Sequence, residues 1–213
     1  MSRVSLVAVT VWAAGLCAAA SEALAAQSAV VVRLYDTTGA SVEVRDAAIR
    51  TASEITEQAG VTLQWKDCSR GGADFPCTGI RGPRELVVRL MQEPREADVR
   101  AADALSVPGA NGGAELQIGF AAIEPATGAG VLATIYYDRV ERVAARSAIP
   151  GGLFLGRAIA HEIGHLLLPT RPHSRSGLMR AVWTAAGSSD DQPGDWFFST
   201  DDSRRLRAAA AAR

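Results

Sequence analysis

The 213-residue sequence has few of the side chains that carry metal and redox chemistry, with only three histidines and three cysteines. Long apolar runs are scarce as well, since the longest, residues 4–20, is short for a stable membrane span. Neither charge dominates, because 22 Lys and Arg face 23 Asp and Glu and the formal net charge is −1. This balance provides no bulk attraction to nucleic acid or to a membrane, and we expect neither as a partner.

The first 26 residues have the pattern of a secretory signal peptide. Arg3 precedes the apolar run and small residues follow it at 23–26, so cleavage after Ala25 or Ala26 satisfies the small-x-small rule. The residues before Cys17 lack the usual order of a lipoprotein cleavage site, which disfavours lipid anchoring. We therefore expect a secreted or periplasmic protein whose mature chain, 27–213, forms one domain with a buried core.

The mature sequence alternates between strand and helix patterns, which predicts an α/β domain. Strands are predicted at 29–35, 61–65, 85–91, 115–123 and 131–137, and the loop E-P-A-T-G-A-G joins the last two as a hairpin. Helices are predicted at 45–59, 94–104, 152–167 and 204–213, with a short one through Ala145 that Asp138 would cap. The helix at 204–213, at the alanine-rich end of the chain, is expected to be a surface helix that frays.

All three histidines lie in the stretch A-H-E-I-G-H-L-L-L-P-T-R-P-H-S. His161 and His165 are four residues apart, so a helix places them one turn apart on the same face. The surrounding residues are mostly apolar, and buried polar side chains on such a helix cost free energy unless they are partnered. Because a divalent cation satisfies two neutral imidazoles together, the pattern predicts a metal site.

Catalytic zinc has three protein ligands and one open position. Pro169 and Pro172 predict that the helix ends, and His173 follows them as a candidate third ligand. An acidic third ligand remains an alternative, and it would come from Asp190, Asp191 or Asp195. Glu162, next to the first histidine, is expected to act as general base towards a zinc-activated water and then as acid towards the leaving amine.

The segment 160–180 resembles the metzincin clan of zinc peptidases, in which H-E-x-x-H is followed by a turn, a third histidine and a methionine-containing turn. Ser174 follows the third histidine, and Met179 in S-G-L-M-R takes the place of the Met-turn methionine, with a structural role. The family's glycine and third histidine would fall at Leu168 and Arg171, so His173 comes two residues late.

The resemblance implies an α/β (α+β) metzincin-like fold with a twisted mixed sheet, a backing helix, an active-site helix and a small C-terminal subdomain below the cleft. Residues 27–168 would form the upper subdomain and 169–213 the lower one. It also implies Zn²⁺ as cofactor and a peptide or protein substrate, which would bind in extended conformation along strand 115–123 by strand addition. We expect a monomer.

Cys68 and Cys77 are the two cysteines that remain after signal removal, and they are predicted to form a disulfide in an exported chain. The alternative is a thiolate ligand that keeps the zinc latent. The loop follows a strand directly and contains no pro-segment sequence, which favours the disulfide.

The leading functional hypothesis is an exported zinc endopeptidase in which Glu162 acts on water held by His161, His165 and His173. The alternative is a zinc-stabilised secreted binding module whose metzincin-like site is not catalytic. A third interpretation, a metal-free core helix, predicts that a chelator leaves folding unchanged.

Overall fold

The computed structural model describes residues 29–69, 77–94, 118–124, 130–168, 173–181 and 193–213. The predicted signal peptide and all but the first residue of the predicted helix 94–104 lie outside these ranges. Within them, no helix has the length and apolar character needed to cross a membrane.

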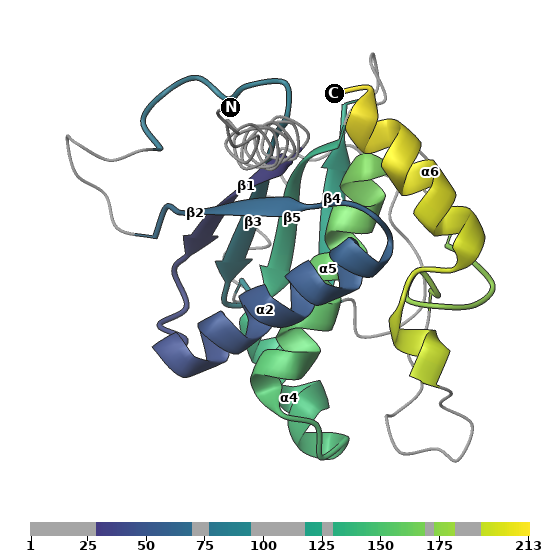
Figure 1. Ribbon diagram of the computed structural model, residues 1–213. Coiled ribbons are helices and arrows are strands. Elements are labelled where there is room, and N and C mark those ends of the chain that lie inside the picture. Colours follow the sequence, from purple (N-terminus) through teal and green to yellow (C-terminus); the bar gives the residue numbers. More distant parts are fainter. Residues whose placement is uncertain (1–28, 70–76, 95–117, 125–129, 169–172, 182–192) are drawn as a thin grey trace, which may run out of the picture.

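One five-stranded sheet forms the centre of the described fold, with the strand order β2-β1-β3-β5-β4 (Figure 1). The strands are β1 (Val30–Asp36), β2 (Leu63–Asp67), β3 (Glu85–Met91), β4 (Gly119–Ile123) and β5 (Gly130–Tyr136). The first four in this order, β2, β1, β3 and β5, pair in parallel, whereas β4 pairs antiparallel with β5 at one edge. The predicted pairing of the last two strands is therefore confirmed.

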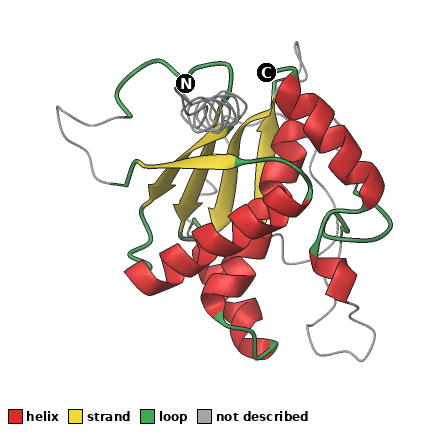
Figure 2. Ribbon diagram, in the orientation of Figure 1, coloured by secondary structure: helices red, strands yellow, loops and turns green. Residues whose placement is uncertain are grey.

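Four α-helices accompany the sheet in the described ranges: α2 (Val42–Gln58), α4 (Tyr137–Arg146), α5 (Gly151–Leu167) and α6 (Thr200–Ala211), with a 3₁₀ turn, η1, at Pro193–Trp196. Helices α2 and α5 contact one another and lie across one face of the sheet (Figure 2). The predicted mixed α/β class is thus confirmed.

The core lies between the sheet and these two helices. Apolar residues at alternate positions of β1 and β3 are buried, because strand side chains alternate between two faces; they are Val30, Val32, Leu34, Leu86, Val88 and Leu90. On α2 the buried residues Ala48, Ala52 and Ile55 follow helical spacing. Small side chains on this face let α5 approach closely.

Two predicted boundaries were wrong for local reasons. Helix α2 begins at Val42, earlier than predicted, because the Ser41 hydroxyl accepts the Val44 N–H and caps it. Strand β2 begins at Leu63, because Val61 still belongs to the turn after α2, where its N–H donates to Thr56 O.

Asp138 does not cap α4. The helix begins at Tyr137, and its N-cap residue, Tyr136, makes no side-chain capping hydrogen bond. Asp138 instead accepts hydrogen bonds from the Glu93 N–H at 2.8 Å and from Arg142 at 2.9 Å. Its carboxylate therefore ties the start of α4 to the end of β3.

The predicted C-terminal helix is present, but its packing against the fold was not predicted. Helix α6 begins at Thr200, four residues earlier than predicted, and Leu206 and Ala210 are buried. Arg213, beyond its end, donates to Leu166 O at 2.8 Å and to Gly130 O at 3.1 Å. The alanine-rich sequence has little apolar periodicity, so its packing was not evident.

Arginines from other elements satisfy carbonyls at three helix ends. Arg207 donates to Ala59 O at the end of α2, Arg213 donates to Leu166 O in α5, and Arg84 donates to Ala210 O in α6. The last carbonyls of a helix lack partners within it and carry partial negative charge, so a cation there is favourable. These contacts fasten α6 to the rest of the fold.

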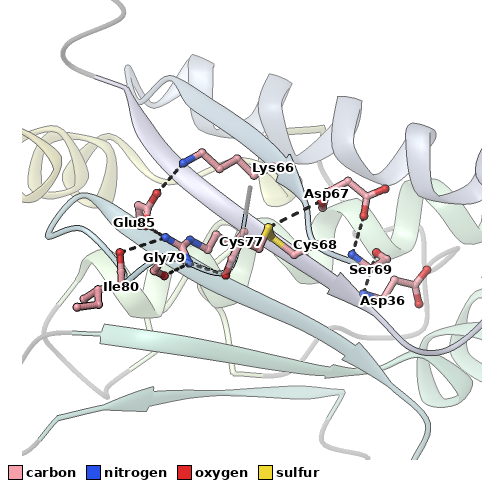
Figure 3. Close-up of a disulfide and its surroundings, with 10 residues drawn as sticks. Asp36, Lys66, Asp67, Cys68, Ser69, Cys77, Gly79, Ile80 and Glu85 are labelled. Atoms are coloured by element: carbon pink, nitrogen blue, oxygen red, sulfur yellow. Dashed lines mark hydrogen bonds and ion pairs between the residues drawn. A yellow bond between two sulfur atoms is a disulfide. The ribbon is translucent and has the colours of Figure 1, made fainter. Parts of the chain in front are cut away.

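The predicted disulfide is present: Cys68 and Cys77 are bonded, with their Cα atoms 5.8 Å apart (Figure 3). The loop that follows is held by Arg33 of β1, which is only 6% exposed. Its guanidinium donates to Cys77 O at 3.2 Å and to Gly79 O at 2.9 Å. A covalent bond and a buried cation together fix this loop against the sheet.

Glu85 at the start of β3 neutralises the buried Arg33. It forms an ion pair with Arg33 and accepts a hydrogen bond from Lys66 Nζ at 2.7 Å (Figure 3). Burial by itself would raise the pKa of Glu85, but hydrogen bonds from Lys66, the Gly82 N–H and Arg33, together with the Arg33 charge, lower that pKa to about 2.

We expect Glu85→Gln to change how stability depends on pH. A carboxylate whose pKa is about 2 in the folded protein and 4.5 unfolded stabilises the fold above pH 4.5, and this stabilisation is lost as the pH falls towards 2. The variant should be less stable at neutral pH and lose less stability between these values. Urea unfolding at a series of pH values measures the free energy of unfolding of both proteins. The same dependence of this free energy on pH in both would contradict the expectation.

We expect Gly156→Ala to destabilise the contact between α2 and α5. A Cβ at Gly156 would lie 2.5 Å from Thr51 Cβ and 2.7 Å from Ala48 O, so the helices would have to separate. Overpacking of this kind costs about 1–3 kcal/mol. Gly151→Ala in the same helix is the matched control, because no atom lies within 4 Å of its added Cβ. Chemical denaturation compares the two, and equal midpoints would contradict the expectation.

Candidate metal centre

Helix α5 carries two of the three histidines into the protein interior. Fourteen of its 17 residues are buried, and His161 and His165 are each 8% exposed. Gly164 lies between them and permits close packing from below, since a Cβ there would lie 2.5 Å from Met179 Sδ. The sequence pattern therefore produces a buried helix with two imidazoles on one face.

The helix ends where its following proline requires. Leu168 has φ −87° and ψ 109°, an extended conformation that a residue before proline prefers. Pro169 and Pro172 themselves lie outside the described residues. The chain is described again from His173, which is exposed and lies beside the two helical histidines.

The three imidazoles converge through their Nε2 atoms. His165 Nε2 lies 3.1 Å from His161 Nε2 and 3.2 Å from His173 Nε2. Two nitrogens bound at 2.0–2.1 Å to a tetrahedral zinc ion lie about 3.3 Å apart, so these separations are close to those of a shared ion. The three residues could hold a metal ion, and the structure brings His173 to the other two.

Of the three competing aspartates, only Asp195 is described, and it is not part of this cluster. Asp195 forms an ion pair with Arg180, with 3.2 Å between Oδ2 and Nη1. Asp190 and Asp191 lie outside the described residues. Among the described residues, these three histidines form the only group of donors arranged for a metal.

A backbone carbonyl orients the first histidine. Leu178 O lies 2.8 Å from His161 Nδ1, and because a carbonyl only accepts, Nδ1 carries the proton and Nε2 keeps its lone pair. Burial, with the neighbouring His165 next in importance, lowers the pKa of His161 to about 3. Metal ions bind neutral imidazole, so this environment suits a ligand.

Glu162 lies in the same buried region with an unused acceptor. The residue is 6% exposed, and its Oε2 has no hydrogen-bond partner among the described residues. Burial raises the pKa of this carboxyl group to about 8. Buried polar atoms without partners are uncommon in native proteins and call for a ligand or a proton to complete them.

Strand β4 reaches this carboxyl group through a glycine. A Cβ at Gly119 would lie 2.9 Å from Glu162 Oε1 and 2.8 Å from Thr134 O, so only glycine lets the strand approach at this distance. Sequence reasoning missed this residue. A glycine inside an otherwise apolar strand does signal close backbone approach, and that signal could have found it.

The turn after His173 returns the chain to the helix. Ser174 N–H donates to Met179 O at 2.8 Å, and Gly177 has φ +75°, a conformation that favours glycine. Met179 is buried against α5 at Gly164, and Leu178 supplies the carbonyl that orients His161. Sequence reasoning singled out Met179 but missed Leu178. Leu178 acts through its backbone carbonyl, which every residue type has.

Comparison of the chain with models of known protein families gives no match, and comparison with curated proteins gives none either. The arguments for a function therefore come from the geometry of the three histidines and Glu162.

We expect replacement of any one of the three histidines by alanine to weaken metal binding strongly, because each supplies one of the converging nitrogens. Asp195→Asn is the control for the competing ligand and should bind metal like the wild type. Metal content after dialysis and competition with a chromophoric chelator measure the affinities. Tight binding by His173→Ala together with loss in Asp195→Asn would assign the third position to the aspartate.

Metal should also stabilise the fold. An ion that binds only the folded protein at a thousandfold excess over its Kd stabilises it by about 4 kcal/mol, and a chelator should reverse this. Thermal unfolding with and without zinc measures the change. An unchanged unfolding curve would support a metal-free core helix instead.

Proposed function

We propose that this chain is an exported zinc-dependent endopeptidase of the metzincin type. The observation that carries the proposal is the convergence of three imidazole nitrogens, together with Glu162, which follows the first histidine on α5 and has a buried carboxyl group with an unused acceptor. A structural metal site would be closed by four protein ligands, whereas three ligands with one open position are typical of catalytic zinc. Three donors together with a neighbouring acid or base therefore favour hydrolysis.

The donor set favours zinc among the metals of proteins. Neutral imidazole suits Zn²⁺, and also copper, nickel and iron, whereas Ca²⁺ and Mg²⁺ prefer oxygen ligands. Three histidines around an open position are the ligands of several zinc hydrolases and lyases. His161, His165 and His173 would hold the ion, with Leu178 O fixing the orientation of the first ring.

Zinc, when bound, supplies a Lewis acid that polarises a carbonyl group and lowers the pKa of water. The protein supplies the proton transfers. Glu162 would take a proton from the attacking water at a carboxylate oxygen and deliver it to the leaving amine, which is general base and then general acid catalysis. Its burial on α5 keeps competing solvent from the carboxyl group.

The edge position of strand β4 is an observation in favour of a peptide substrate. It is the last strand of the sheet on this side, and no described strand pairs with its outer edge. Its Gly119 lies against Glu162, so a peptide added along this edge would pass the proposed base. Main-chain hydrogen bonds of strand addition bind an extended chain and fix its register.

The metzincin assignment draws on the order of elements as well as on the motif. The described fold has a mixed sheet, a helix α2 packed against the helix α5 that carries the motif, and a buried methionine, Met179, after His173, and these features support the proposal. Export depends on residues 1–26, which lie outside the described ranges, and it stays a prediction together with the monomeric state.

A zinc-stabilised binding module without turnover is the second candidate. The pKa of Glu162, raised to about 8 by burial, favours it, because a neutral carboxylic acid cannot accept a proton. A nearby cation acts in the opposite direction, since positive charge stabilises the carboxylate. The two candidates share the metal site and differ in hydrolysis alone.

We expect Glu162→Gln to bind zinc like the wild type and to cleave peptides about 10²–10⁴-fold more slowly, the usual contribution of a general base. Glutamine keeps the size of the side chain but cannot accept the proton. Glu57→Gln, an exposed residue of α2, is the matched control. Cleavage of a proteome-derived peptide library by the zinc-loaded proteins measures the rates. A wild type that holds zinc and cleaves no peptide would identify the binding module.

A further inference from the structure

The third histidine is held differently from the other two. His161 and His165 are buried on a helix, whereas His173 is exposed on an irregular segment. A metal site is only as well ordered as its least constrained ligand, because each donor must be placed before it can bind without an entropic cost. The contacts that fix the chain beside His173 therefore matter to the affinity of the site.

Ser174, the next residue, is anchored on two sides. Its N–H donates to Met179 O at 2.8 Å, which closes the turn. Its hydroxyl group donates to Asp202 and lies 2.9 Å from both Oδ1 and Oδ2. The second contact joins residues 28 positions apart and links the turn to helix α6.

Asp202 is a buried carboxylate directed at this turn. It is 2% exposed, and besides Ser174 it accepts a hydrogen bond from Ser199 Oγ at 2.7 Å. Both the backbone and the carboxylate of Asp202 contact the N-cap residue of α6, because the Asp202 N–H donates to Ser199 Oγ and the carboxylate accepts from the same hydroxyl group. The contact of the carboxylate with Ser174 lies outside this cap and joins α6 to the turn.

The residues that lead into α6 also contact the turn near His161. Phe197 O accepts the Leu178 N–H at 2.7 Å, and Leu178 O is the atom that orients His161. Phe197, just before α6, thus contacts Leu178, whose carbonyl orients the first histidine. Asp202, in the first turn of α6, contacts Ser174, which follows the third histidine.

We propose that Asp202 is a positioning residue of the metal centre: by holding the Ser174 hydroxyl it fixes the backbone next to His173 and raises the affinity for the metal. The inference rests on the metal site of the proposed function and extends it to a residue outside the histidine motif. Asp202 acts through Ser174 and touches neither metal nor substrate.

The test compares Asp202→Asn, Ser174→Ala and the double variant, with Asp201→Asn as control. Asp201 is the exposed neighbour of Asp202 in the first turn of α6, so its replacement makes the same charge change at the same helix end. Ser174→Ala keeps the capping of α6 intact and probes the same contact if Asp202→Asn does not fold. Ser174→Thr retains the hydroxyl group.

We expect Asp202→Asn and Ser174→Ala each to weaken zinc binding about 10–100-fold, the usual effect of removing an outer partner of a ligand. The double variant should bind no more weakly than the weaker single variant, because Asp202→Asn weakens the same contact that Ser174→Ala removes. Ser174→Thr and Asp201→Asn should bind like the wild type. Zinc competition titrations and the visible absorption of bound Co²⁺, which reports a change of ligand arrangement, provide the readouts.

Additive losses in the double variant would show that the two residues act separately and would overturn the inference, as would wild-type affinity in Asp202→Asn. These outcomes leave the proposed hydrolase intact, because they concern affinity alone. A wild-type chain that binds no metal would overturn both.

Discussion

The convergence of three imidazole nitrogens inside a buried helix interface is the constraint on which the rest of the site depends. At 3.1 and 3.2 Å from His165 Nε2, the nitrogen lone pairs of the other two rings need a proton or a metal cation between them, because bare lone pairs repel each other. The Leu178 carbonyl strengthens this demand, because it holds the proton of His161 on the opposite ring nitrogen. A donor set that could hold a metal ion and the packing of α5 are therefore parts of one arrangement, in which polar side chains occupy what would otherwise be apolar core.

Glycines bring the other elements close enough to α5 for that arrangement. Gly156 admits α2 and Gly164 admits Met179, while Gly119 of β4 lets the sheet edge approach Glu162. In each case an added Cβ would lie under 3.0 Å from a neighbouring atom, so the distances between layers are set by missing side chains. The helix is thus surrounded at van der Waals contact on several sides, which limits how its polar residues can move.

The C-terminal part of the chain contributes more than a surface. Arg207 and Arg213 reach the ends of α2 and α5, while Phe197 and Asp202 contact the turn that follows the third histidine. Helix α6 therefore connects the turn beside the three histidines to the sheet from outside the motif. Substitutions in this helix should therefore change the positions of the histidines, although the helix carries none of them.

Sequence pattern alone located β3, the long helix α5 and the cluster of three histidines, because strand and helix periodicities and H-E-x-x-H depend on local spacing. The start of α2, the role of Asp138 and the packing of α6 escaped it, since competing caps and distant partners decide them. Gly119 left a local signal, because it is a glycine inside an otherwise apolar strand, but Leu178 and Asp202 could only be found in three dimensions. These two contribute a backbone carbonyl and a contact across 28 residues, neither of which leaves a local signal. Residue identity determined which chemistry was present, and tertiary packing decided which atoms meet, because distances between remote segments are properties of the whole fold.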